Sequence, residues 1–328
     1  MITDLTAKIQ KGQNLLLEEM DGVMDELLST HVSDQKKAEF LRHLTKKGET
    51  DDELYAMLAK MDSLGIHVKP KCDGTLIDVC GTGGDNMQTF NISTSAAFVI
   101  AACGGFVAKH GNRSVSGVSG SADIFEFFGY DLDSPPQKIE KIIEKFKIGF
   151  LFAQKFHPAM KNVAPARKLV GARTAFNLLG PLCNPAQVKN QLIGVFSDQY
   201  LERIVSILKR RNAQNIMTVH SEDGLDELST SSKSKICFLH DGKIEKSVID
   251  PQKLGLHESK TKDLQISSKQ EAIKSFLSVL NGTANRSMQE ITALNAAGGL
   301  IVANIAQNFD EGVEMTLQTT IWDRKSVV

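Results

Sequence analysis

Glycines and hydroxyl-bearing residues that follow the first predicted strand of this chain are suited to binding an anion. Glycine lets main-chain N–H groups approach an anion closely, and the start of the next predicted helix adds unpaired N–H groups and a positive dipole end. The pattern is neither the dinucleotide-binding G-x-G-x-x-G nor the P-loop, so a tight turn with an ordinary helix cap stays the alternative. The residues are Gly81-Thr82-Gly83-Gly84-Asp85, Thr89 and Asn91-Ile92-Ser93-Thr94.

A second loop, after the next predicted strand, combines two cations, one imidazole and two hydroxyl groups. Loops that follow successive strands of a βα protein meet at the carboxyl edge of the sheet, where ligands bind. We therefore expect this loop to lie beside the first and to bind the same phosphate-bearing ligand; a surface loop of mixed polarity is the alternative. Ser119 and Ser121 open the following helix. The loop is Lys109-His110-Gly111-Asn112-Arg113-Ser114-Val115-Ser116-Gly117.

Four carboxylates within six residues, Glu222, Asp223, Asp226 and Glu227, indicate a site for a hard cation. Mg²⁺ is typically held by one or two carboxylates together with substrate phosphates and water. A plain acidic surface turn is the alternative. Combined with the two phosphate-binding loops, this cluster predicts a site for a polyphosphorylated small molecule with bridging Mg²⁺.

The segment from Lys109 to Arg173 is basic, with 11 Lys and Arg against 6 Asp and Glu, a local net charge of +5. Part of this charge belongs to a solvated helix face that carries Lys138, Lys141 and Lys145. The remainder includes the motif His157-Pro158-Ala159-Met160-Lys161 and the cation Arg167.

Three histidines, His110, His157 and His220, are candidate general bases, but a lone histidine is more often structural. No Ser-His-Asp or Cys-His arrangement is apparent, so covalent catalysis is not indicated. The sequence identifies no general base and no catalytic residue.

The elements that position these residues change character near residue 70. Up to about residue 65 the apolar spacing predicts helices only, including one that begins with the capping box Thr50 to Glu53. Short apolar runs then alternate with helical patterns, which favours a mostly parallel sheet with helices on its faces. His240-Asp241-Gly242-Lys243 predicts a late hairpin at the sheet edge. The predicted strands are Leu76–Cys80, Phe106–Ala108, Phe150–Ala153, Leu192–Phe196, Ile216–Val219 and Lys235–Leu239.

We therefore expect a small helical domain over residues 1–68, with a later helical contribution near 165–185, and a large α/β domain over 69–328. The composition fits this reading: 328 residues are 41% hydrophobic and 23% charged, with a net charge of −1. These values exclude disorder and coiled coil as the main structure, and they give no support for nucleic-acid or membrane-surface binding.

Five cysteines without a Cys-x-x-Cys pair favour reduced thiols in a cytoplasmic protein over a disulfide framework. The first residues lack the basic flank and apolar run of a signal peptide. The longest mostly apolar stretch, 96–108, is shorter than the roughly 18 residues that a membrane span needs.

In their order and spacing, the glycine-rich loop, the Lys109 loop, the His157 motif and Asp223-Gly224-Leu225-Asp226-Glu227 resemble the anthranilate phosphoribosyltransferase family. The resemblance extends over nearly the whole chain. It implies a phosphoribosyltransferase fold of the nucleoside phosphorylase type and a homodimer joined through the helical domain. It also implies transfer of the phosphoribosyl group of phosphoribosyl pyrophosphate to the amine of anthranilate. This reaction gives N-(5-phosphoribosyl)anthranilate and pyrophosphate in tryptophan biosynthesis.

The resemblance also implies site residues. Anthranilate contacts Gly81, Asn112 and Arg167, whose guanidinium pairs with the carboxylate. Ser93, Asp226 and Glu227 hold Mg²⁺. Phosphoribosyl pyrophosphate contacts Gly81, Gly84, Asp85, Thr89, Asn91, Ile92, Ser93, Thr94, Lys109, His110, Gly111, Asn112, Arg113, Ser114, Val115, Ser116, Gly117 and Ser121.

Two other functions remain open on the sequence. A pyrimidine nucleoside phosphorylase of related fold uses free phosphate without an essential metal, and the pair Asp226 and Glu227 argues against it. A non-catalytic sensor binds the phosphate-bearing ligand without turnover.

Overall fold

The structure is a computed structural model that describes residues 1–85, 87–114 and 117–322. The chain forms two compact units, which we call the helical unit (Met1–His67 with Ala153–Pro185) and the sheet unit (Val68–Phe152 with Ala186–Val328). The later segment of the helical unit begins at Ala153, earlier than the expected contribution near 165–185, because the chain turns from strand into helix there.

The helical unit packs amphipathic helices around a core of methionine, leucine and phenylalanine. Its predicted capping box is confirmed: Thr50 Oγ1 accepts a hydrogen bond from Glu53 N, and Glu53 Oε2 accepts one from Thr50 N. The buried ammonium of Lys37 donates to the main-chain oxygens of Ser29 and Asn162, at 2.6 Å each, and so links the two segments of this unit. The helices are α1 (Ile2–Gln10), α2 (Leu17–Leu28), α3 (Asp34–Lys47), α4 (Asp51–Ser63), α8 (Ala153–Phe156), α9 (Ala164–Val170) and α10 (Ala175–Leu179).

The sheet unit is built on a seven-stranded sheet in the order β3-β2-β1-β4-β5-β6-β7. The first five strands in this order are parallel, and β6 and β7 continue the sheet as an antiparallel hairpin. The mostly parallel sheet and the edge hairpin are therefore confirmed. The strands are β1 (Leu76–Gly81), β2 (Phe106–Gly111), β3 (Ile148–Phe152), β4 (Asn190–Gly194), β5 (Asn215–Ser221), β6 (Ser234–His240) and β7 (Lys243–Ile249).

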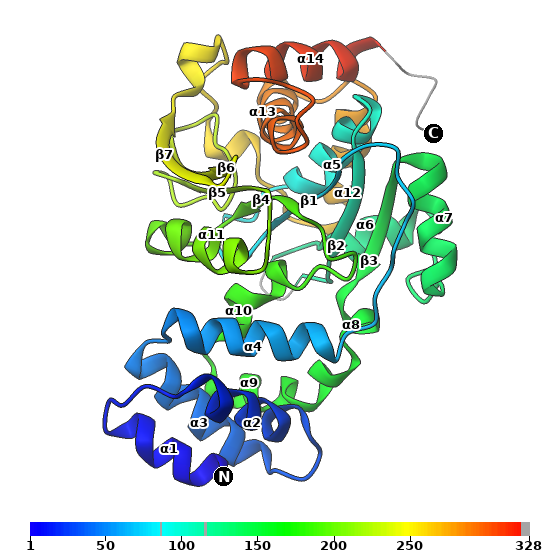
Figure 1. Ribbon diagram of the computed structural model, residues 1–328. Helices are drawn as coiled ribbons and strands as arrows, with labels where there is room; N and C mark the ends of the chain where they lie inside the picture. Colours follow the sequence, from blue (N-terminus) through cyan, green and yellow to red (C-terminus); the bar gives the residue numbers. More distant parts are fainter. Residues whose placement is uncertain (86, 115–116, 323–328) are drawn as a thin grey trace. The chain divides into compact units, whose positions relative to one another are not determined.

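Helices cover both faces of this sheet, as a parallel sheet requires. Figure 1 shows α13 and α11 on opposite faces, with α5 beside α13. Apolar side chains of β1, β2 and β4 pack with those of α5 and α13 in the main core. The helices of this unit are α5 (Ile92–Ala102), α6 (Ser121–Phe127), α7 (Pro136–Phe146), α11 (Leu201–Arg210), α12 (Lys269–Leu280), α13 (Arg286–Val302) and α14 (Phe309–Trp322).

The predicted strands are found with shifted ends. Strand β3 begins at Ile148, two residues before the prediction, and Ala153 already belongs to α8. Phe146 continues the apolar spacing of Ile139 and Ile143 but is 59% exposed, because it is the last residue of α7. In the part of the chain that the structure describes, no helix is long and apolar enough to cross a membrane.

Candidate functional site

The glycine-rich loop leaves the carboxyl end of β1, the strand between β2 and β4. Gly83 and Gly84 have φ values of 68° and 83°, in the left-handed region that glycine adopts without steric cost. This turn directs the Gly83 N–H to Asp226 Oδ2, with an N···O distance of 2.7 Å. Asn91 is the N-cap of α5, and Ser93 lies within the first turn of this helix, so its hydroxyl is available for other contacts.

The segment 222–227, which we call the acidic segment, follows β5 and brings Asp226 and Glu227 to the glycine-rich loop. Burial and the nearby carboxylate of Asp85 raise the pKa of Asp226 to about 7. Burial and Asp226 raise the pKa of Glu227 to about 8, although the positive charge of Lys109 and a hydrogen bond from Ser93 oppose this shift. The surrounding protein alone therefore does not fully stabilise two negative charges at this position.

Side chains of the same unit hold the acidic segment in place. Asn295 of α13 binds both main-chain groups of Leu228: its Oδ1 accepts from Leu228 N at 2.9 Å, and its Nδ2 donates to Leu228 O at 2.8 Å. Asp223 accepts a hydrogen bond from Ser229 Oγ at 2.6 Å. Asp223 thus closes the turn, while Asp226 and Glu227 face the glycine-rich loop.

Lys109 of β2 is 1% exposed, and its ammonium contacts β1 and the start of α5. The Nζ atom donates to Val79 O at 2.7 Å and to Ser93 Oγ at 3.3 Å. Burial lowers the pKa of Lys109 overall, and the negative charge of the neighbouring Asp78 opposes part of this shift. Ser93 therefore connects a buried cation to the carboxylate of Glu227.

Sequence reasoning missed Asp78, a fully buried carboxylate in β1. Its Oδ1 accepts from His110 N at 3.1 Å, and its Oδ2 accepts from Gln191 Nε2 at 3.4 Å, so it joins β1 to both neighbouring strands. A single acid in the apolar run Leu76-Ile77-Asp78-Val79-Cys80 was the available signal. An acid at a buried strand position needs donors and a nearby cation, and here it finds both.

A second group of predicted residues gathers at the start of α5 and α6. Thr94 Oγ1 and Ser121 Oγ are 3.2 Å apart, and Asn91 Nδ2 donates to Ser119 O at 3.2 Å. The Oδ1 atom of Asn91 is buried and has no hydrogen-bond partner among the described residues. An unpaired buried acceptor is costly unless a ligand or water supplies a donor. This atom is therefore a candidate contact for a ligand hydroxyl.

The Lys109 loop turns its arginine toward α6. Arg113 donates to both carboxylate oxygens of Glu126 at 2.7 Å each and to Asp123 Oδ1 at 3.2 Å. Ser114 Oγ accepts from Gly117 N at 2.7 Å. In this structure the guanidinium of Arg113 therefore anchors the loop to α6. Val115 and Ser116 lie outside the described residues.

The remaining predicted contacts have mainly main-chain roles in the structure. Thr89 forms an isolated antiparallel bridge with Gln265. Ile92 is 2% exposed, with its side chain in the core, so only its main chain can contact a ligand. Asn112 O accepts from Ala122 N at 3.3 Å. At Gly111 a Cβ would lie 2.8 Å from the ring of Phe150, so glycine is required for strand packing.

Arg167 belongs to helix α9 of the helical unit. Its guanidinium lies over the ring of Phe176, 5.6 Å from the ring centroid, and burial lowers its pKa. Within the described part of the chain, no carboxylate forms an ion pair with Arg167. A partly buried guanidinium stacked on an aromatic ring and lacking a protein anion is suited to binding a ligand carboxylate.

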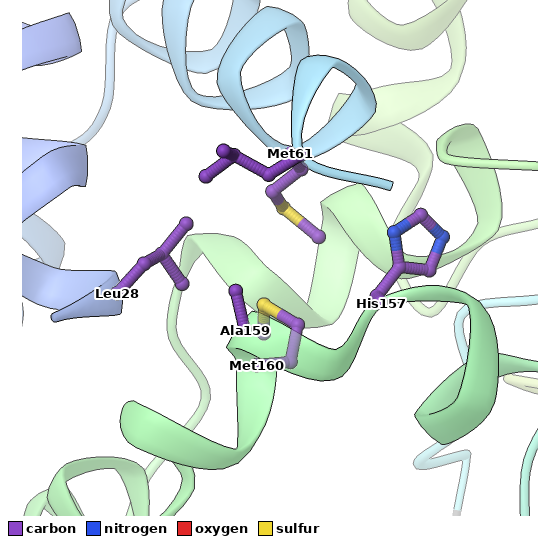
Figure 2. A pocket seen from close by; sticks show the side chains of 6 residues that line it. Leu28, Met61, His157, Ala159 and Met160 are labelled. Atoms are coloured by element: carbon purple, nitrogen blue, oxygen red, sulfur yellow. The ribbon is translucent and has the colours of Figure 1, made fainter. Parts of the chain in front are cut away.

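His157, a candidate base from the sequence, has a structural environment. It lines a small pocket of the helical unit together with Leu28, Met61, Ala159 and Met160 (Figure 2). The pocket volume is about 10 Å³, which is near the minimum for one water molecule and too small for a substrate. The Nε2 atom of His157 lies 2.8 Å from Cys183 O, and burial lowers the pKa of the ring.

The oxygen atoms of the acidic segment fit a divalent cation that takes its remaining ligands from water and substrate phosphates. The described residues contain no group of three or more His, Cys, Asp or Glu side chains arranged to hold a metal ion. Two crowded carboxylates with raised pKa values and the Ser93 hydroxyl instead suit Mg²⁺, which usually retains water and binds substrate phosphates. The residues present therefore fit the metal predicted from the sequence.

Comparison with known proteins agrees with this geometry. The model of a glycosyl transferase family, a/b domain, matches residues 73–321, and that of its helical bundle domain matches residues 3–65. Anthranilate phosphoribosyltransferase of Nitrosopumilus maritimus (strain SCM1) is 61% identical over 319 residues, which cover 97% of this chain and 92% of that protein. The chain belongs to the anthranilate phosphoribosyltransferase family.

Solved structures of the anthranilate phosphoribosyltransferase family have the same fold. The enzyme from Thermus thermophilus superposes with a TM-score of 0.88 at 36% identity, covering 96% of this chain and 94% of that one. The enzyme from Saccharomyces cerevisiae in complex with PRPP and Mg gives a TM-score of 0.87 at 23% identity, with coverage of 97% and 93%. At 23% identity the second comparison bears on the fold alone.

Proposed function

We propose that this chain transfers the phosphoribosyl group of phosphoribosyl pyrophosphate to the amine of anthranilate, as in tryptophan biosynthesis. The bond from the ribose C1 atom to the pyrophosphate oxygen breaks, a bond from C1 to the amine nitrogen forms, and the nitrogen loses a proton. The observation that carries the proposal is the meeting of three motifs at one sheet edge. There Asp226 accepts from the glycine-rich loop, and Ser93 contacts both Glu227 and Lys109.

The residues of the sheet unit bind and orient the phosphorylated substrate. Main-chain N–H groups at the start of α5 are suited to the pyrophosphate, beside the loop from Gly81 to Asp85, with Lys109 supplying a buried positive charge. Asn91, Thr94 and Ser121 offer an acceptor and hydroxyl groups nearby. These contacts hold the leaving group where negative charge develops, which favours cleavage of the C1–O bond.

The acidic segment is proposed to hold Mg²⁺ through Asp226, Glu227 and the Ser93 hydroxyl. When bound, the metal neutralises charge on the departing pyrophosphate. Deprotonated carboxylates are required as ligands, so a cation at this position offsets the crowding that raises the pKa of both acids.

Arg167 is proposed to pair with the carboxylate of anthranilate. Its stacking on Phe176 supports this, as does the absence of an ion pair with any carboxylate of the described residues. Gly81 and Asn112 of the sheet unit are proposed further contacts of this substrate. The aryl amine is neutral at pH 7, so it needs no prior deprotonation to attack. No side chain is assigned as the base that accepts the proton released afterwards.

The proposal also covers how the protein assembles and where in the cell it acts. We propose a homodimer joined through the helical domain, which comprises residues 1–68 with a later contribution near 165–185, and a cytoplasmic location. The remainder of 69–328 forms the α/β domain. A mass by light scattering of about twice 35.9 kDa supports the dimer, and a mass of 35.9 kDa contradicts it.

Loss of anthranilate fluorescence on incubation with phosphoribosyl pyrophosphate and Mg²⁺ tests the activity. Turnover that requires all three components supports the proposal, and no turnover above the blank overturns it. Phosphate-dependent release of uracil or thymine would indicate a nucleoside phosphorylase instead. Binding of phosphoribosyl pyrophosphate without turnover would indicate a sensor.

A further inference from the structure

Two glycines lie side by side where the acidic segment crosses the sheet. Gly81 ends β1, Gly194 ends β4, and the two are partners in the parallel register of these strands. Because neither has a side chain, the carboxyl ends of β1 and β4 form a bare patch of main chain. Asp226 lies on this patch.

The contact with Asp226 is too close for any side chain. A Cβ built on Gly194 would lie 1.5 Å from the main-chain oxygen of Asp226 and 2.6 Å from its carbonyl carbon. A Cβ on Gly81 would lie 2.6 Å from Asp226 Oδ2. Gly194 thus makes room for the main chain of Asp226, and Gly81 makes room for its carboxylate.

The main chain at the end of β4 also fixes the glycine-rich loop. Gly194 O accepts a hydrogen bond from Thr82 N at 2.9 Å, and Phe196 N donates to Thr82 Oγ1 at 3.1 Å. The loop fixed in this way donates from Gly83 N to Asp226 Oδ2 at 2.7 Å. Gly194 therefore contacts the main chain of Asp226 and also that of Thr82, the residue before the donor Gly83.

We propose that Gly194, paired with Gly81, is a positioning residue that seats Asp226 in the orientation required for metal binding. It acts through the main chain of Asp226 and contributes no ligand atom itself. This inference rests on the proposed function, because the metal site belongs to that function. It adds a residue of β4 to a site otherwise built from the loops after β1, β2 and β5.

Three alanine variants test the proposal. Gly194→Ala displaces the Asp226 main chain, whereas Gly81→Ala pushes only the carboxylate, which can rotate aside. Gly149→Ala is the matched control, since this glycine of β3 is also crowded, with a Cβ 2.6 Å from Ile143 Cγ1, but the crowding atom belongs to a side chain remote from Asp226. The readouts are Mn²⁺ binding by electron paramagnetic resonance in the presence of phosphoribosyl pyrophosphate, and the thermal unfolding midpoint.

We expect Gly194→Ala to weaken Mn²⁺ binding roughly 10- to 100-fold, as the loss of outer-shell support for a metal ligand typically does. Gly81→Ala should weaken it less, and Gly149→Ala should bind Mn²⁺ like the wild type even if its unfolding midpoint falls. Folded Gly194→Ala protein with wild-type Mn²⁺ binding overturns the proposal. If Gly194→Ala does not fold, Gly81→Ala decides, with Mn²⁺ binding measured without phosphoribosyl pyrophosphate because Gly81 is also a proposed contact of that substrate. Weakened Mn²⁺ binding then supports the positioning role of the glycine pair, and unchanged binding overturns it.

The wild-type measurements separate this inference from the proposed function. If the wild type binds Mn²⁺ but does not turn over anthranilate, the proposed transferase activity is contradicted. The proposed role of Gly194 in positioning Asp226 is then unaffected. If the wild type does not bind Mn²⁺, the proposed positioning role of Gly194 is contradicted, whether or not the protein is active.

Discussion

At the scale of single residues, burial determines how the charged groups of the site behave. Asp226 and Glu227 are buried and lie near other carboxylates, so their pKa values rise. Lys109 is buried beside them and shares Ser93 as a partner. Without a ligand, the charges in this group do not balance one another. Replacing any one of these side chains should therefore change ligand binding.

Replacing Asp226 with asparagine tests the metal role directly. The amide keeps the shape but loses the charge that attracts Mg²⁺, so the Mg²⁺ concentration for half-maximal activity should rise by about ten-fold or more. A titration of activity against Mg²⁺ measures this. Glu222→Gln is the control, because Glu222 is exposed in the same segment and loses the same charge. An equal shift in both variants would mean that only the general field of the segment matters.

Arg167 gives a second prediction at this scale. Arg167→Ala removes two potential charge-assisted hydrogen bonds to a carboxylate, so the KM for anthranilate should rise about ten-fold or more while the KM for phosphoribosyl pyrophosphate changes little. Steady-state kinetics with each substrate varied measure this split. Lys168→Ala, an exposed cation next in the helix, should leave both values near the wild type. An unchanged KM for anthranilate in Arg167→Ala would remove this residue from the amine site.

At the scale of elements, periodicity and turn residues predicted most of the sheet unit. Short apolar runs marked the strands, and the helical spacing marked the helices between them, because buried faces impose these patterns. The pairing of strands is set by long-range contacts that no local pattern records. For that reason the partnership of Gly81 with Gly194 and the cross-strand role of Asp78 were not predicted.

The site residues divide in the same way. Residues within one motif, such as Gly81 to Asp85, could be placed at a strand end from the sequence. The engagement of Arg113 by Glu126 could not, because it depends on how α6 packs beside the loop. The anchoring of Leu228 by Asn295 joins positions 67 residues apart, and Asn295 is a polar residue within the apolar stretch 293–302 of α13.

The burial of His157 predicts how the stability of the helical unit depends on pH. Burial lowers its pKa in the folded protein below the ordinary histidine value of 6.5, so the unfolded chain binds a proton that the folded chain rejects as the pH falls. The stability contributed by neutral His157 is therefore complete above pH 6.5 and is lost as the pH falls below it. His157→Gln can keep a donor to Cys183 O without titrating.

The unfolding midpoint of the wild type should accordingly fall more steeply than that of His157→Gln between about pH 6.5 and 5. Calorimetric scans of both proteins across this range measure the difference in slope. The exposed His31 provides the control, since His31→Gln should retain the wild-type slope. Parallel curves for wild type and His157→Gln would show that the ring does not titrate differently in the folded and unfolded states.

At the scale of the whole molecule, the net charge of −1 conceals a division of charge along the chain. The basic segment from Lys109 to Arg173 runs through both units, and part of its charge is neutralised by ion pairs such as those of Arg113. The acidic segment, in contrast, keeps carboxylates with raised pKa values at the sheet edge. The metal position therefore combines two crowded carboxylates with a single buried cation, Lys109, and most of the other cations of the basic segment lie outside this group.

Ligand binding should stabilise the sheet unit in a way that depends on metal. A ligand that binds only the folded state at about 100 times its Kd adds about 2.7 kcal/mol. For a chain of this size that corresponds to an upward shift of the unfolding midpoint by several degrees, on the order of 2–4 °C per kcal/mol. We expect this shift with phosphoribosyl pyrophosphate and Mg²⁺ together and most of it to vanish with EDTA. Asp226→Asn should lose the metal-dependent part, whereas Glu222→Gln should keep it. An equal shift with and without EDTA would show that the pyrophosphate binds through the loops alone, and that the acidic segment has another role.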